Sequence, residues 1–141
     1  MDAFSVLLVD DEEEFLETLV KRLRKRKLTV SGVKSGEEAI EFLKKEAVDI
    51  VVLDVKMPGM GGLASLNEIK TNWPLVEVIM LTGHANMEAA IEGMELGAFD
   101  YLMKPMDIDE LLYKLQDAYK KKMLQEQRIK LAVEEVSGGK E

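Results

Sequence analysis

Residues 48–54 read VDIVVLD, a short apolar segment that ends in an aspartate. The segment lacks polar and apolar alternation, which is typical of a strand buried on both faces of a parallel sheet. A second run of this kind, VIML at 78–81, is followed by Thr82, and three more of strand length occupy 4–9, 28–33 and 99–103. We therefore predict five strands, the third of which (48–53) leads directly into Asp54.

Segments with the helical spacing of apolar residues separate these strands. Five stripes are marked by Phe15 to Leu23, Ala39 to Leu43, Leu63 to Ile69, Met87 to Met94 and Leu111 to Tyr119. Ser35 with Glu38, and Asp107 with Glu110, have the spacing of capping boxes, and Gly97 follows the fourth helix. Strict alternation of strand and helix predicts an α/β fold, a five-stranded parallel doubly wound sheet (βα)5 with helices on both faces.

Composition limits the classes of function. The chain has 141 residues, enough for one domain, with 47% hydrophobic and 33% charged residues and a net charge of −8. This acidity argues against direct nucleic-acid binding, and the absence of cysteine excludes disulfides, thiolate metal sites and thiol nucleophiles. The N-terminus lacks the basic region of a signal peptide, and no apolar run is long enough to span a membrane. We therefore expect a cytoplasmic protein without a membrane partner.

Charged side chains collect where the predicted strands end. Asp10 and Asp11 follow the first strand, Asp54 the third, Thr82 the fourth and Lys104 the fifth. In an open parallel sheet these ends form the crevice where ligands bind. Each residue alone is more often a turn former, a cap or a solvated side chain. Their joint placement at successive strand ends is what predicts a site.

The charges of this group predict its chemistry. Three carboxylates and one ammonium sum to −3 + 1 = −2, which matches one divalent cation. All the available ligands are oxygens, which favours Mg2+ over zinc or copper. Acids, a metal, a lysine and a hydroxyl together suit phosphoryl transfer, with Asp54 as the nucleophile.

Four segments resemble the receiver domain of bacterial two-component response regulators: LLVDDEEEF (7–15), VVLDVKMPGMGG (51–62), IMLTGHANMEAA (79–90) and AFDYLMKPM (98–106). The resemblance covers about residues 4 to 120. The run LTGHANMEAA is similar to receivers of enhancer-binding transcription activators. By analogy, the resemblance implies the flavodoxin-like strand order 2-1-3-4-5.

The resemblance also implies roles for individual residues. Asp54 would be the phosphoacceptor, taking its phosphoryl group from a histidine kinase or phosphotransfer protein. Asp11 and Asp54 would bind Mg2+ through their carboxylates, Lys56 through its backbone carbonyl and Asp10 through bound water. Lys104 would pair with the phosphoryl oxygens.

A switch follows from the same resemblance. Thr82 and Tyr101 would form the switch pair, acting on an output face of the fourth helix, fifth strand and fifth helix. A buried aromatic without a switching role is the alternative for Tyr101. Lys56 and His84 would tune the phosphoryl lifetime, although His84 equally fits a solvated loop residue. The Lys104–Pro105 peptide bond is expected to be cis.

Two segments lie outside these motifs. The basic run KRLRKRK (21–27) predicts a solvated helix face, with a docking surface for an acidic patch on a kinase as the alternative. We assign 1–120 to the receiver and 121–141 to a C-terminal helical extension or linker, frayed at its end. Its seven-residue apolar repeats are interrupted at Lys122 and Glu126, too weak a pattern to predict a coiled coil. An extended fifth helix, a linker to an output domain and a partner-binding segment all remain open.

Three functions fit these observations. The leading hypothesis is a receiver that is not an enzyme with an external product, catalyses only its own phosphorylation and dephosphorylation, and switches binding of a downstream effector or output domain. A phosphorylation-dependent homodimer is one form of that switch. The second is the N-terminal receiver of a larger DNA-binding transcriptional regulator. The third is a Mg2+-dependent phosphohydrolase, disfavoured because Lys56 stands where such enzymes commonly place a second acid.

Overall fold

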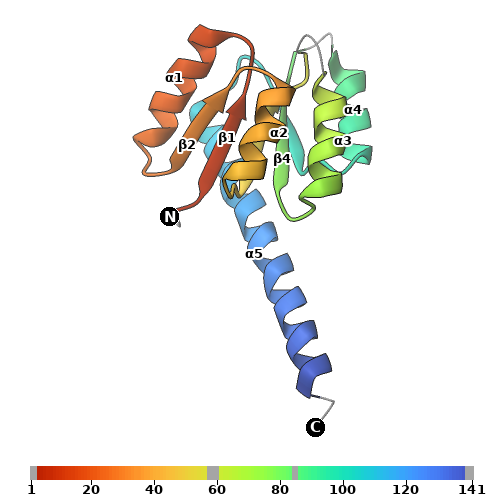
Figure 1. The fold of residues 1–141 in the computed structure, drawn as a ribbon. Helices are drawn as coiled ribbons and strands as arrows, with labels where there is room; N and C mark the ends of the chain where they lie inside the picture. The colour runs from red at the N-terminus through yellow and green to blue at the C-terminus, as the bar shows by residue number, and fades with distance from the viewer. Residues whose placement is uncertain (1–2, 57–60, 84–85, 139–141) are drawn as a thin grey trace.

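Strands and helices alternate through the whole chain (Figure 1). The structure, a computed structural model, describes residues 3–56, 61–83 and 86–138. In chain order the elements are β1 Ser5–Val9, α1 Glu13–Arg24, β2 Thr29–Val33, α2 Gly36–Lys45, β3 Ile50–Asp54, α3 Gly62–Asn72, β4 Glu77–Thr82, α4 Met87–Glu95, β5 Asp100–Met103 and α5 Ile108–Gly138. The predicted number and kind of elements are confirmed.

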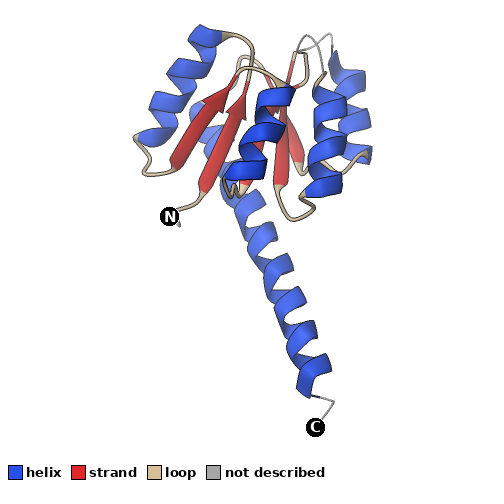
Figure 2. Cartoon of the chain, viewed as in Figure 1, coloured by secondary structure: helices blue, strands red, loops and turns tan. Residues whose placement is uncertain are grey.

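The strands form one parallel sheet in the order β2-β1-β3-β4-β5, as predicted (Figure 2). The order matters for function because β1 and β3 are neighbours, with Val9 opposite Leu53. Asp10, which follows Val9, and Asp54, which follows Leu53, therefore lie side by side at the ends of these strands. In open parallel sheets, ligands bind at this carboxyl-terminal edge.

Two apolar cores lie on opposite faces of the sheet. Side chains of α1 and α5 cover one face, around Leu23, Leu111 and Leu115, and those of α2, α3 and α4 cover the other, around Leu66 and Ile69. Every residue of β3 and β4 is buried, which explains why their sequences do not alternate.

At the opposite, amino-terminal edge of the sheet, two strands begin at other residues than predicted. Polar side chains form hydrogen bonds and ion pairs there. β3 begins at Ile50 rather than at residue 48, because the Asp49 carboxylate accepts hydrogen bonds from the backbone N–H and hydroxyl of Ser5 (2.8 and 3.1 Å). β4 begins at Glu77, which is buried between Lys70 and Lys121, with N–O distances of 3.3 and 3.1 Å. The predicted fourth strand began at residue 78, so the buried Glu77 was not included in it.

The two predicted capping boxes form only in part. Ser35 accepts from the Glu38 N–H (3.1 Å), but the Glu38 carboxylate accepts from the Lys34 N–H rather than that of Ser35. Asp107 caps α5 through the Asp109 N–H (2.9 Å) rather than that of Glu110. Gly97 has φ +106°, in the left-handed region that glycine favours, and ends α4 as expected.

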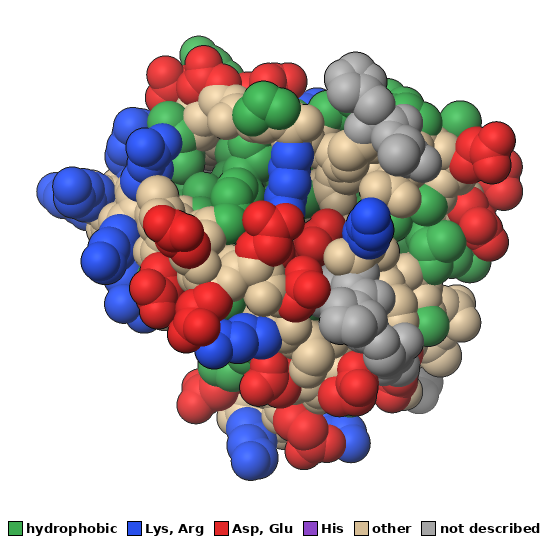
Figure 3. Space-filling view, turned by 90° about the horizontal axis from the view of Figure 1, so that it is seen from above, with side chains coloured by type: hydrophobic (Ala, Val, Ile, Leu, Met, Phe, Trp, Pro, Cys, Tyr) green, Lys and Arg blue, Asp and Glu red, His purple; other side chains and the backbone are tan. Residues whose placement is uncertain are grey.

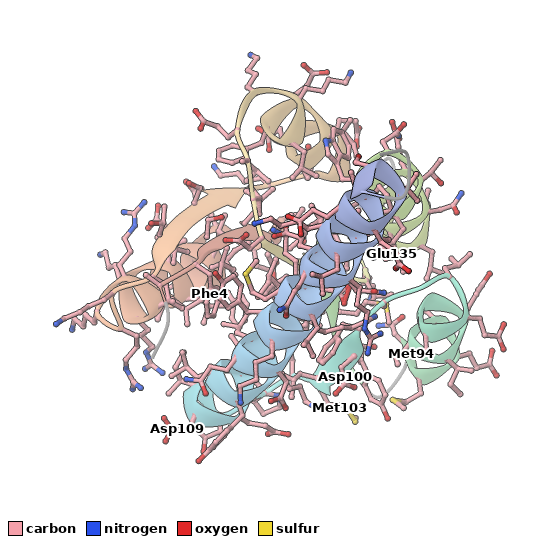
Figure 4. The ribbon with its side chains drawn as sticks, turned by 90° about the horizontal axis from the view of Figure 1, so that it is seen from below. Phe4, Met94, Asp100, Met103, Asp109 and Glu135 are labelled. Atoms are coloured by element: carbon pink, nitrogen blue, oxygen red, sulfur yellow. The ribbon has the colours of Figure 1, made fainter. Side chains whose placement is uncertain are left out.

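Helix α5 runs unbroken through Gly138 and projects far below the sheet (Figure 1). Seen from below, it runs from Asp109 at the sheet towards Glu135 near its free end (Figure 4). Lys122 and Glu126, which interrupt the apolar repeats, pair with each other, and Lys122 also pairs with Asp49 (both 2.8 Å). They therefore fix the helix to the sheet at the point where it leaves the domain.

No helix among the described residues combines the length and the apolar character that crossing a membrane requires.

We predict that Lys122→Met lowers the free energy of unfolding by about 1–2 kcal/mol, because the half-buried Asp49 loses its charged donor. Urea denaturation measures the difference. Lys44→Met is the matched control, because its partner Glu41 and Lys44 itself are both exposed, and its effect should stay within about 0.5 kcal/mol. Equal effects of the two substitutions would contradict the anchoring role of Lys122.

Candidate functional site

Three carboxylates meet at the carboxyl-terminal edge of the sheet. Asp10 and Asp11 follow β1, Asp54 closes β3, and one oxygen of each lies within 4.8 Å of the others. Asp10 and Asp54 are 2% and 6% exposed, whereas Asp11 is exposed. Seen from above, acidic side chains border a basic one in a hollow at this edge (Figure 3). The structure thus brings together the carboxylates that the sequence placed at separate strand ends.

Asp10 is held by two donors of different origin. Its Oδ1 accepts from the Glu12 backbone N–H (2.9 Å), just before α1 begins, and its Oδ2 lies 2.8 Å from Lys104 Nζ. The first contact fixes the turn that leads into the helix, and the second ties β1 to the end of β5. Asp10 is thereby oriented before any ligand binds.

Lys104 is the one cation within 4 Å of these carboxylates among the described residues. Its Nζ lies 3.9 Å from Asp54 Oδ2 and 3.8 Å from the exposed Glu12 carboxylate. Partial burial alone would lower the pKa of the Lys104 ammonium. The hydrogen bond and charge of Asp10, with the charge of Asp54, outweigh burial and raise that pKa above its ordinary value.

The environment of Asp54 favours its neutral form. Burial and the neighbouring Asp10 charge raise the pKa of Asp54 to about 6, although the Lys104 ammonium and the Lys56 N–H (3.2 Å) oppose the rise. The Lys104 ammonium therefore does not fully offset the effects of burial and of the Asp10 charge. A divalent cation beside Asp54 would favour its ionised form.

The geometry of the carboxylates fits a hard cation such as Mg2+. Ligand oxygens on opposite sides of Mg2+ lie about 4.2 Å apart, because each bond is about 2.1 Å long. Neighbouring ligand oxygens of an octahedral ion lie closer, at about 3 Å. The three oxygens, within 4.8 Å of one another, would therefore move closer together to bind one ion directly. The donor set is entirely oxygen, as Mg2+ prefers.

The hydroxyl of Thr82 lies at the end of β4, the strand beside β3, but is engaged elsewhere. Thr82 is 1% exposed, and its Oγ1 lies 3.2 Å from the carbonyl oxygens of both Gly83 and Asn86. Tyr101 is half-buried against the core under α2, α3 and α4, whereas Lys104 contacts Phe15 of α1. Tyr101 and Lys104 therefore lie on opposite faces, as strand periodicity predicts.

The remaining predicted residues are placed only in part. Lys56 is exposed, and its backbone N–H reaches Asp54, so its main chain borders the site. The Lys104–Pro105 peptide bond is cis, as expected. His84 lies outside the described residues, so its predicted role stays a prediction.

The sequence reasoning missed one residue at the site. The ring centroid of Phe15 lies 4.2 Å from Lys104 Nζ. Phe15 belongs to the first turn of α1, and helical spacing assigned it to the core, where part of the ring does pack. The signal that could have found it is its position four residues after Asp11, within the turn that begins at the site.

The sequence of this chain is similar to those of known proteins. Residues 6–116 match the family model described as the response regulator receiver domain. The chain is 41% identical over 105 residues to the DNA-binding transcriptional regulator NtrC of Escherichia coli, covering 74% of this chain and 22% of that protein. It is 37% identical over 117 residues to the transcriptional regulatory protein ZraR of the same organism, covering 83% of this chain and 26% of that protein.

A solved structure gives the same result. The response regulator receiver domain protein from Clostridium thermocellum superposes with a TM-score of 0.83 at 34% identity, covering 86% of this chain and 98% of that one. The chain spans about a quarter of the length of the curated relatives described above. By sequence and by fold, this chain belongs to the receiver-domain family of two-component response regulators.

Proposed function

We propose that Asp54 accepts a phosphoryl group from a histidine kinase or phosphotransfer protein, with Mg2+ bound by Asp11, Asp54, the Lys56 carbonyl and, through water, Asp10. The observation that carries this proposal is the gathering of three carboxylate oxygens within 4.8 Å beside a single ammonium. A bound Mg2+ ion would offset negative charge on the carboxylates and the incoming phosphoryl oxygens.

The chain's own residues supply orientation and charge. An ionised Asp54 oxygen forms the new bond to phosphorus, while the bond from phosphorus to the donor atom breaks and that atom keeps the electron pair. Lys104 Nζ, already 3.9 Å from Asp54 Oδ2, donates to a phosphoryl oxygen. Asp10 holds Lys104 in reach through the 2.8 Å contact. The chain would thus catalyse only its own phosphorylation and dephosphorylation, with Lys56 and His84 tuning the latter.

The switch begins at Thr82. Its hydroxyl now donates to neutral backbone carbonyls of Gly83 and Asn86, and a phosphoryl oxygen on Asp54 would be a stronger, charged acceptor. Movement of Thr82 towards Asp54 changes the space beside β5, and the half-buried Tyr101 is placed to fill it.

The output face would be α4, β5 and α5. Ile91 of α4 and Tyr113 of α5 are 57% and 71% exposed, and Asp100 of β5 forms an ion pair with Lys114 of α5 (2.6 Å). Met94, Asp100 and Met103 appear together on one side of α5 in Figure 4.

A downstream effector, an output domain or a second copy of this chain would bind at this face. If a second copy binds, the mass in solution should double when beryllofluoride, a phosphoryl mimic, is added.

The similarity to NtrC supports a second candidate, the receiver portion of a DNA-binding transcriptional regulator. Both E. coli relatives are named as regulators of transcription, and this chain spans about a quarter of their length. In that case residues 1–120 form the receiver and 121–141 the connection to an output domain. The exposed apolar residues of the projecting part of α5, such as Leu124 and Val133, suit such a connection.

We predict that incubation with Mg2+ and acetyl phosphate adds the mass of one phosphoryl group, and that Asp54→Asn abolishes the addition because the nucleophilic oxygen is lost. Intact-mass spectrometry measures the increment, with chelation of Mg2+ as the second control. A label that persists on Asp54→Asn would overturn the assignment of the phosphoacceptor. Rapid release of many equivalents of phosphate would favour a phosphohydrolase.

The raised pKa of Asp54 has a consequence for stability. From an ordinary value of 3.8 the folded-state pKa rises to about 6, so between these values the folded protein keeps a proton that the unfolded chain has lost. The free energy of unfolding therefore falls as pH rises through that window and stays lower above it. Bound Mg2+ opposes the fall, because it binds the ionised carboxylate of the folded state.

We predict that, without divalent cations, Asp54→Asn is close to wild type in stability near pH 4 and more stable by about 1–2 kcal/mol near pH 8. Urea denaturation across this range measures the difference, and added Mg2+ should reduce it. Asp117→Asn, which removes an exposed carboxylate from α5, controls for the change in net charge. A gain in stability that is the same near pH 4 and near pH 8 would contradict the elevated pKa.

We predict that Thr82→Val still becomes phosphorylated but loses the response at Tyr101, because the hydroxyl that follows the phosphoryl group is gone. The measurement is the change in the NMR signals of the Tyr101 ring when beryllofluoride and Mg2+ are added. Thr82→Ser keeps the hydroxyl and should retain most of the change. A full response in Thr82→Val would refute the coupling between the two residues.

A further inference from the structure

Lys104 has neighbours of two kinds around its ammonium group. Three carboxylates lie within 4 Å of Nζ, from Asp10 (2.8 Å), Glu12 (3.8 Å) and Asp54 (3.9 Å). The ring of Phe15 lies beside the same atom, with its centroid 4.2 Å away. The side chain of Lys104 is 21% exposed, so the ammonium is partly shielded from water.

The ring is itself held in place. Phe15 is half-buried and packs against the core cluster beneath α1 and α5. It lines a hollow of about 170 Å3 between α1 and the segment before α5, together with Leu19 and Met106. Because α1 is fixed by its buried Leu16, Leu19 and Leu23, the ring has a defined position relative to the end of β5.

The contact attracts the ammonium without competing for its hydrogen bonds. The face of an aromatic ring carries negative potential and attracts a cation within about 6 Å, more strongly where water is excluded. A carboxylate at the same place would accept a hydrogen bond from one of the three N–H groups of Lys104. The ring leaves these protons available to Asp10 and to an incoming anion.

The ring also opposes a competing position of Lys104. The Glu12 carboxylate is 67% exposed and only 3.8 Å from Nζ, so it can draw the flexible lysine towards solvent. Phe15 lies one helical turn after Glu12, and both flank the lysine from the start of α1. Contact with the ring favours the inward position between Asp10 and Asp54.

We propose that Phe15 is a positioning residue for phosphoryl transfer, holding the Lys104 ammonium by a cation–π contact where it meets the phosphoryl oxygens. This inference rests on the proposed function of Asp54 and adds a residue to it. Phe15 does not touch the reacting atoms; it acts through Lys104.

The test compares rates of phosphorylation by acetyl phosphate with saturating Mg2+, followed by intact mass. Phe15→Leu keeps an apolar side chain of similar size without the ring face, and we expect the rate to fall by about 2- to 30-fold. Phe15→Tyr keeps the ring and should stay within about 2-fold of wild type. Urea denaturation of each variant shows whether the fold is retained.

A double-mutant cycle separates positioning from packing. In Lys104→Met, which keeps the aliphatic stem but not the charge, the further change Phe15→Leu should have little effect on the rate. An equal loss in both backgrounds, or a Phe15→Tyr variant as slow as Phe15→Leu, would overturn the positioning role. An unchanged rate in Phe15→Leu would do the same while leaving Asp54 as phosphoacceptor. A wild type that takes up no phosphoryl group would overturn both proposals.

Discussion

Repulsion among the carboxylates at the end of β1 and β3 is the constraint on which the site depends. At about 5 Å and an effective dielectric constant near 20, each pair of charges repels by roughly 3 kcal/mol. The backbone keeps Asp10 and Asp54 close together, because β1 and β3 are hydrogen-bonded neighbours and β3 is buried. Lys104 relieves part of the repulsion, and burial together with the charge of Asp10 still raises the pKa of Asp54 to about 6. The fold therefore maintains a deficit of positive charge at one defined place.

The two edges of the sheet treat charge differently. At the amino-terminal edge the half-buried Asp49 pairs with Lys122, and the buried Glu77 lies between Lys70 and Lys121. Hydrogen bonds and charge from Lys122 and Ser5 lower the pKa of Asp49, although partial burial acts in the opposite direction. At the carboxyl-terminal edge three carboxylates share one lysine. The paired charges of the amino-terminal edge anchor α5 to the sheet, whereas the carboxyl-terminal edge keeps an excess of negative charge, as the proposed binding of Mg2+ requires.

Much of this could be read from the sequence because its signals are local. Continuous apolar runs identified the buried strands, and the acidic residues that follow them had to meet once the sheet was parallel. The strand order came by analogy, since spacing along the chain does not determine which strands are neighbours. Glu77 was not predicted as part of its strand because a carboxylate does not fit the apolar run at 78–81, and its burial depends on Lys70 of α3 and Lys121 of α5. Phe15 was assigned to the core because helical spacing shows only which face of a helix is apolar. It does not show that Lys104, at the end of β5, contacts that face.

The hydrogen bonds of Thr82 set the size of the free-energy change that the proposed switch would use. A hydroxyl has one proton to donate, so the two contacts of 3.2 Å to Gly83 and Asn86 share a single donor. A neutral hydrogen bond contributes about 1 kcal/mol net and one to a charged group about 1.5–3 kcal/mol. Exchanging one for the other gains on the order of 1 kcal/mol, roughly a fivefold shift in population. A shift of that size biases two conformations rather than locking one, so in the proposed switch a partner that binds the output face would supply the rest of the free energy.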